Sequence, residues 1–355
     1  MYYFPTRVFC MKHKIFIIVW LLLFYSTSSH ASEIAQEIQA VNAETQFRLG
    51  SLYHKSTADS KDQQKAFSWF QKSARLGHAG AQYQLAVMYY QGKGTLKDLK
   101  KAFTWLKKSA QQGDASAQYQ LGIMYYQGKG MIKDPKRAFY WLEKSAQQGD
   151  GNAQYQLAAM YHNGEGTPRS PIQELSWVEK SARQGHRAAQ FRLGVMYYRG
   201  EGTPKDPKRA LPWVEKSARQ GNAMAQYQLA AMYHTGKGTL KDAKRAFFWF
   251  KKSARQGHRA AQYQLGDMYY RGEGTLKDQE RAFSWVEKSA RQGDRAAQYQ
   301  LAVMYYLGKG TAKDLKRAFS WFEKSAKQGH RAAQRQLRVM SYKGEGQVTT
   351  EDGGL

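Results

Sequence analysis

Histidine is the side chain in this sequence that could most readily act as a metal ligand or a general base. Four of the nine histidines recur at multiples of 36 residues: His78, His186, His258 and His330. The other members of the same series are Asp114, Asp150, Asn222 and Asp294. Asp and Asn are preferred at helix N-termini, where their side chains accept backbone hydrogen bonds. We therefore interpret the series as helix caps, and not as a metal site.

The common catalytic motifs are absent from the sequence. Ser-x-x-Lys, Gly-x-Ser-x-Gly and His-Glu-x-x-His do not occur. Paired glycines such as Gly92 and Gly94 lack the third glycine and the preceding strand of a dinucleotide site. The single cysteine, Cys10, lies in the N-terminal segment. We expect no catalytic residue, cofactor or metal, and therefore no enzyme.

The N-terminal segment has the pattern of a secretory signal peptide. Lys12 and Lys14 precede an apolar run, Ile15 to Tyr25, and small residues follow up to Ala31. The run has about eleven residues, whereas a membrane-spanning helix needs about 20. We expect cleavage after Ala31 and a periplasmic or secreted chain without a stable membrane anchor. An uncleaved anchor is the alternative.

The sequence is strongly basic. It has 55 Lys and Arg against 28 Asp and Glu, and a net charge of +27. The signal peptide would remove Arg7, Lys12 and Lys14, leaving 52 cations against 28 acids, or +24. Such a charge attracts anionic partners. Export weighs against nucleic acid and favours an acidic protein, an envelope glycan or lipid head groups.

Two series of residues recur every 36 positions without interruption. The tryptophans are Trp69, Trp105, Trp141, Trp177, Trp213, Trp249, Trp285 and Trp321. The glutamines are Gln82, Gln118, Gln154, Gln190, Gln226, Gln262, Gln298 and Gln334. A fixed period of this length indicates a solenoid of stacked repeats.

The sequence of each 36-residue repeat predicts two helices. Asp114 begins the first helix as its cap, and Gly128 and Gly130 end it. Asp134 caps the second helix, with Pro135 at the first helical position. In the next repeat Ser170 and Pro171 take these two places, and serine is a near-equivalent cap.

The tryptophans lie on the apolar stripe of the second helix. Ala138, Trp141, Leu142 and Ala146 share one helical face, which predicts that the indoles are buried between stacked helix pairs. A box of rings that stacks on a ligand is the alternative. Pro212, inside a second helix, predicts a kink.

The repeated pattern resembles the Sel1-like repeat, a relative of the tetratricopeptide repeat. It reads Ala-x-x-x-Leu-Gly-x-Met-Tyr-Tyr-x-Gly-x-Gly-Thr-x-Lys-Asp, then Ala-Phe-x-Trp-x-x-Lys-Ser-Ala-x-Gln-Gly. The resemblance implies an all-α fold, a right-handed α-solenoid of about eight 36-residue helix–turn–helix repeats plus a terminal half-repeat. We expect a signal peptide at 1–31, an N-terminal segment at 32–42, the solenoid at 43–346 and a disordered tail at 347–355.

By similarity to tetratricopeptide repeats, one stripe of each first helix lines a concave groove. The expected partner-binding residues are Tyr83, Tyr90, Tyr119, Tyr126, Tyr155, His162, Phe191, Tyr198, Arg199, Tyr227, His234, Tyr263, Asp267, Tyr270, Arg271, Tyr299 and Tyr306. The next position varies most, as expected for tailored contacts: Gln91, Gln127, Asn163, Arg199, Thr235, Arg271 and Leu307. Tyrosine suits recognition because it offers a large ring and one hydroxyl at little entropic cost. The alternative is that some of these rings only pack between repeats.

Asp267 stands alone in an otherwise apolar column of that stripe. It could pair with Arg271, one turn further on, or contact a cationic ligand. We expect Arg199, Asp267 and Arg271 to sharpen the specificity of the groove.

Sel1-like proteins are commonly adaptors in signalling, envelope assembly and encounters between bacteria and host cells. The resemblance therefore implies a monomeric scaffold that binds a protein or peptide partner. A peptidoglycan- or polysaccharide-binding role is the alternative. A weaker one is a β-lactamase-like hydrolase, because a cysteine-rich subgroup of the family has been associated with that activity.

Overall fold

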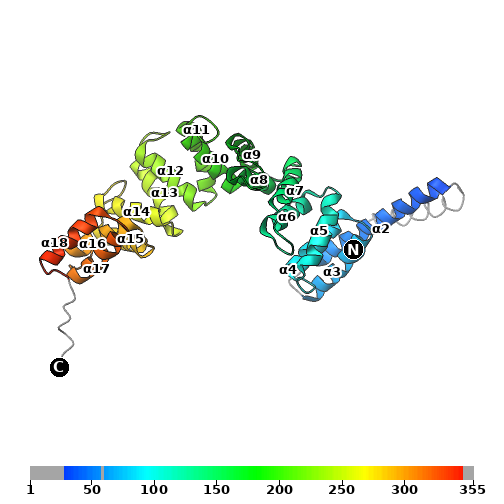
Figure 1. Ribbon diagram of the computed structural model, residues 1–355, viewed down its shortest axis with the longest axis horizontal. Coiled ribbons are helices and arrows are strands. Elements are labelled where there is room, and N and C mark those ends of the chain that lie inside the picture. The colour runs from blue at the N-terminus through cyan, green and yellow to red at the C-terminus, as the bar shows by residue number, and fades with distance from the viewer. Residues whose placement is uncertain (1–27, 57–59, 347–355) are drawn as a thin grey trace, which may run out of the picture. The chain divides into compact units, whose positions relative to one another are not determined.

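The computed structural model describes residues 28–56 and 60–346, with side chains from residue 35 onward. The predicted signal peptide, for residues 1–27, and the predicted tail lie outside these residues. The described residues form 17 helices and no strand (Figure 1). The all-α repeat architecture predicted from the sequence is confirmed.

The chain divides into two compact units at Arg169 and Ser170. The helices of the first unit are α2 (Ser28–Ser56), α3 (Ser60–Arg75), α4 (Ala79–Gln91), α5 (Leu99–Gln111), α6 (Ala115–Gln127), α7 (Pro135–Gln147) and α8 (Gly151–Asn163). Those of the second unit are α9 (Pro171–Arg183), α10 (Arg187–Arg199), α11 (Pro207–Arg219), α12 (Ala223–Thr235), α13 (Ala243–Arg255), α14 (Arg259–Arg271), α15 (Gln279–Arg291), α16 (Arg295–Leu307), α17 (Leu315–Lys327) and α18 (Arg331–Tyr342). Within each unit, every helix packs against the helices before and after it in the chain.

Side-chain caps fix where the helices begin. The backbone N–H of Ala81 donates to His78 Nδ1 over 3.0 Å, and that of Ala117 donates to Asp114 over 2.7 Å. His186, His258 and His330 cap their helices in the same way. The histidine series therefore serves as helix caps, as the sequence predicted. Ser170 likewise caps α9, over 3.3 Å.

A ladder of buried glutamines links consecutive repeats. Gln82 Nε2 donates to the carbonyl oxygen of Ala74, in the repeat before, over 3.2 Å. Its own Oε1 accepts from Gln112 over 2.8 Å. Gln118, Gln190, Gln226, Gln262 and Gln298 make the same two bonds in their repeats. Because an unpaired buried amide is costly, this ladder favours repeats of one fixed length, as the uninterrupted 36-residue spacing shows.

The tryptophans are partly buried, and Trp105 packs against the core, so the prediction of buried indoles is correct only in part. The residue after each one fills the core instead, as Phe70, Leu106 and Phe322 do at 1% exposure. The indole lies one residue earlier, about 100° away around the helix, and reaches the rim of the stripe. A lysine three residues on covers its outer face; Lys180 Nζ lies 3.9 Å from the centre of the Trp177 ring.

Pro212 does not interrupt its helix. Helix α11 is 13 residues long, as are the other second helices of the second unit. The ring of Pro212 is exposed, so it meets no neighbouring helix. The missing N–H removes one intrahelical bond without ending the helix.

Candidate functional site

The first aromatic column of the expected groove packs between repeats. The Tyr227 ring stacks on His258, the cap of the next repeat, with ring centres 4.7 Å apart, and leans on Phe250 at 5.6 Å. Tyr299 stacks on His330 in the same way at 4.5 Å. These rings remain partly exposed. The packing interpretation therefore holds for Tyr227 and Tyr299, whose rings are fixed in place and still accessible at the surface.

The second aromatic column holds the loop of the following repeat. Tyr126 donates a hydrogen bond of 2.5 Å to Glu165, which lies 39 residues on, between two paired glycines. This bond raises the pKa of Tyr126. Lys129 Nζ donates to Tyr90 over 3.1 Å, from the equivalent loop position. Each hydroxyl is thus held by a charged side chain, which fixes the ring orientation.

The same arrangement recurs in the second unit. Lys309 Nζ donates to Tyr270 over 2.9 Å, and Tyr306 donates to Glu345 over 3.0 Å. His234, which replaces tyrosine in this column, lies 3.8 Å from Glu273.

The most variable column is the accessible one. It follows directly after the second aromatic column on the first helices, and all of its side chains are exposed: Gln91, Gln127, Asn163, Arg199, Thr235, Arg271 and Leu307. Fixed rings therefore lie beside exposed side chains that differ from repeat to repeat. This arrangement can select a partner by shape and hydrogen bonding without any chemistry of its own.

Asp267 pairs with Arg271, which is one of the two possibilities that the sequence left open. Arg271 Nε lies 3.0 Å from Asp267, one turn away on α14, and this charge raises the pKa of Arg271. Arg199 lies 3.5 Å from Glu201 instead. Among the described residues, Arg199 and the Asp267–Arg271 pair thus have separate partners, and the three residues expected to act together do not form one cluster.

Sequence reasoning missed a buried ion pair in the second unit. Glu174, at 3% exposure, accepts a hydrogen bond of 2.6 Å from Arg192 Nε. Arg192 also lies 2.8 Å from Glu201. The signal was present in the sequence: Glu174 takes the place of a small core residue, and Arg192 takes the place of a glutamine. The corresponding pair is Ala138 with Gln156 in the first unit.

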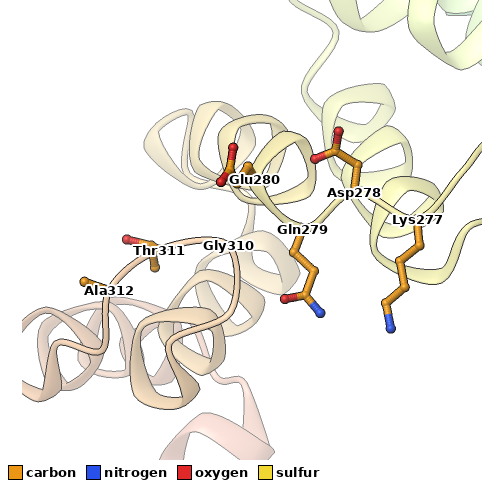
Figure 2. Close-up of a pocket in the computed structure, with 7 residues that line it drawn as sticks. All are labelled: Lys277, Asp278, Gln279, Glu280, Gly310, Thr311 and Ala312. Atoms are coloured by element: carbon orange, nitrogen blue, oxygen red, sulfur yellow. The ribbon is translucent and has the colours of Figure 1, made fainter.

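The second unit contains an open depression lined by loop and helix-start residues. It has a volume of 820 Å³ and lies between the start of α15 and the loop before α17 (Figure 2). Its lining residues are Lys277, Asp278, Gln279, Glu280, Gly310, Thr311 and Ala312. Across the described part of the chain, no group of three His, Cys, Asp or Glu could hold a metal ion. No described helix is long and apolar enough to cross a bilayer.

The histidine caps make the second unit sensitive to acid. Burial, with a smaller effect of Arg259, lowers the pKa of His258 below its ordinary value. The unfolded chain therefore binds a proton more readily than the folded chain, so stability falls as the pH drops through about 6.5 toward the folded pKa. We expect His258→Asn, which copies the cap Asn222, to lose less stability between about pH 7.5 and pH 5. Urea unfolding at both pH values measures this. An undiminished pH dependence would contradict the assignment.

The comparisons with known proteins agree with this architecture. The Sel1 repeat family model matches eight consecutive segments: 43–78, 79–114, 115–150, 151–186, 187–222, 223–258, 259–294 and 295–330. The crystal structure of c5321, a protective antigen of uropathogenic Escherichia coli displaying an SLR fold, is 34% identical with a TM-score of 0.81. The match covers 88% of this chain and 67% of that one.

A Sel1 repeat protein from Oxalobacter formigenes is also similar. It is 30% identical with a TM-score of 0.63, and the match covers 91% of this chain and 94% of that one. No curated protein matches the chain. Repeat length, capping and helix packing thus agree with the family match over 288 consecutive residues, and the chain belongs to the Sel1 repeat family, whose members generally mediate protein–protein interactions.

Proposed function

We propose that this protein is exported and acts as a monomeric, non-enzymatic scaffold that binds a protein or peptide partner along its first helices. The observation that carries the proposal is the exposed variable column beside the two anchored aromatic columns. Family membership supports the class of function, because Sel1 repeat proteins generally bind proteins. The predicted signal peptide at 1–31 supports export to the periplasm or beyond.

Fixed rings beside variable side chains suit a recognition surface. Stacking on His258 and the hydrogen bond from Lys309 hold Tyr227 and Tyr270 before a partner arrives. Less conformational entropy is then lost on binding than with free side chains. The exposed column differs between repeats and would set the preference for one partner.

The excess positive charge favours an acidic partner. The mature balance of 52 cations against 28 acids gives the chain a long-range attraction for anions. Association with an acidic protein would therefore be fast at low salt and slower at high salt.

Site-specific photo-crosslinking in the native envelope tests the proposal. A photoreactive amino acid at Gln127 in the first unit, or at Thr235 in the second, is expected to crosslink a protein that mass spectrometry then identifies. The matched control is Ser284, which is also exposed but lies on the second helix of its repeat. Equal crosslinking from Ser284, or none from the other two positions, would contradict binding through this face. Recovery of the chain with isolated sacculi and without any crosslinked protein would favour a peptidoglycan-binding role instead.

A further inference from the structure

Two aliphatic side chains project from consecutive loops of the first unit. Leu96 lies in the loop between α4 and α5, and Ile132 in the loop between α6 and α7 (Figure 1). They are 88% and 89% exposed. Neither side chain is therefore part of the buried core.

The two loops lie on neighbouring parts of the same unit. The loop between α6 and α7 approaches the start of α5 so closely that a side chain at Gly130 would come within 2.9 Å of the Leu99 carbonyl oxygen. Leu99 follows directly on the loop that carries Leu96. Both tips therefore belong to one edge of the first unit.

Positive charge surrounds both tips. Residues 92–101 contain four lysines and one aspartate, and residues 128–137 contain three lysines, one arginine and one aspartate. The two aspartates are already used: Asp98 caps α5 and lies 3.4 Å from Lys101, and Asp134 caps α7 and lies 3.3 Å from Arg137. Exposed cations therefore dominate the edge, which consists of Leu96, Ile132, Lys97, Lys100, Lys133 and Lys136.

We infer that this edge docks the first unit on an anionic lipid surface. Each aliphatic tip would enter the boundary between head groups and acyl chains, while the adjacent lysines contact lipid phosphates. Single projecting tips fit a fluid surface, which closes around them. A protein interface would instead offer a contiguous apolar patch, whereas Leu96 and Ile132 lie on separate loops with a lysine directly after each. The docking is peripheral. The edge adjoins the partner-binding face, because Lys133 Nζ lies 5.4 Å from the centre of the Tyr126 ring.

The second unit provides a third tip of the same kind and a matched control. Leu240 is 88% exposed, and its loop, residues 236–245, has four cations against one acid, so it is replaced together with the other two tips in the test below. Leu276 occupies the same loop position as Leu96 and is 89% exposed. Its loop, residues 272–281, has three acids, Glu273, Asp278 and Glu280, against two cations. An equally exposed leucine with the opposite local charge should not meet an anionic surface.

Vesicle co-sedimentation of the whole mature chain tests the inference. We expect binding to phosphatidylcholine vesicles containing about 30% phosphatidylglycerol to be at least about tenfold tighter than to phosphatidylcholine alone. The triple variant Leu96→Asp/Ile132→Asp/Leu240→Asp should lower the affinity for the anionic vesicles by at least about tenfold. Leu276→Asp should change that affinity by less than about twofold. All four positions are exposed, and circular dichroism checks that the variants fold.

Three outcomes would overturn the inference. The first is a wild-type chain that does not bind the anionic vesicles. The second is a loss of affinity in Leu276→Asp that equals the loss in the triple tip variant. The third is a loss of affinity in Lys97→Gln/Lys133→Gln that the triple tip variant does not share. The last would show attraction by charge alone. Tighter binding to soluble polyglutamate that depends on the tips would indicate an acidic protein and would also refute lipid docking. None of these results bears on crosslinking through the first helices, so the two proposals fail separately.

Discussion

Replacing Arg192 with glutamine is expected to lower the free energy of unfolding of the second unit by about 3 kcal/mol. The side chain of Glu174 is 4% exposed and lies 2.5 Å from Arg192 Nη2. Removing the cation would leave a buried carboxylate without its opposite charge. The expected cost is at the lower end of the usual range, because glutamine can still donate one hydrogen bond to Glu174.

The double variant Glu174→Ala/Arg192→Gln is expected to recover most of that loss. It creates the alanine–glutamine pair found at the corresponding positions of the other repeats, such as Ala210 with Gln228. Replacing a whole buried ion pair is often neutral, whereas breaking one is costly. A double-mutant cycle by denaturant unfolding measures the coupling. Equal stability of the double variant and Arg192→Gln would show that the two residues are not coupled.

Gly310→Ala is expected to destabilise the second unit by about 3–5 kcal/mol, because strain in the left-handed region adds to an overlap with fixed backbone. Gly310 has a φ of +75°, and a β-carbon there would overlap the carbonyl oxygen of Gln279. Helix α15 begins at Gln279, so the loop cannot move away without shifting the previous repeat.

Gly308→Ala is the matched control for this experiment. Gly308 has a φ of +69°, but its nearest neighbours, in Lys313, would lie 3.3 Å or more from a β-carbon. Only the backbone strain remains, so we expect a loss of about 1–2 kcal/mol. Thermal unfolding of both variants under the same conditions measures the difference in their stability. An equal cost for both would mean that the overlap with Gln279 is relieved without penalty.

The parts of the fold that depend on local chemistry were predictable from the sequence. Asp114 and Ser170 identify helix starts because a cap needs only its own side chain and a backbone three residues on. The burial of Trp141 was not predictable in this way. Trp141 and Leu142 are adjacent on the same stripe, and only the packing of the neighbouring repeats decides which of the two is central.

The candidate site shows the same limit. Sequence periodicity predicts that Tyr227 lies on the groove stripe, and the structure shows its ring packed on His258 while remaining partly exposed. The same side chain can therefore pack between two repeats and also form part of a recognition surface. The pair of Glu174 and Arg192 escaped notice because its members lie 18 residues apart on different helices. Two coincident departures from the repeat pattern are the signal that would have found it.

The glutamine ladder gives every internal junction of the solenoid the same hydrogen-bonded seam. Removing or duplicating a block of 36 residues, cut at equivalent positions, would rejoin a donor such as Gln112 to an acceptor equivalent to Gln82. A cut of any other length would leave these amides facing the wrong neighbours. The gene of such a chain can therefore grow or shrink by unequal recombination in steps of one whole repeat. The solenoid would then change its length without a new interface between repeats.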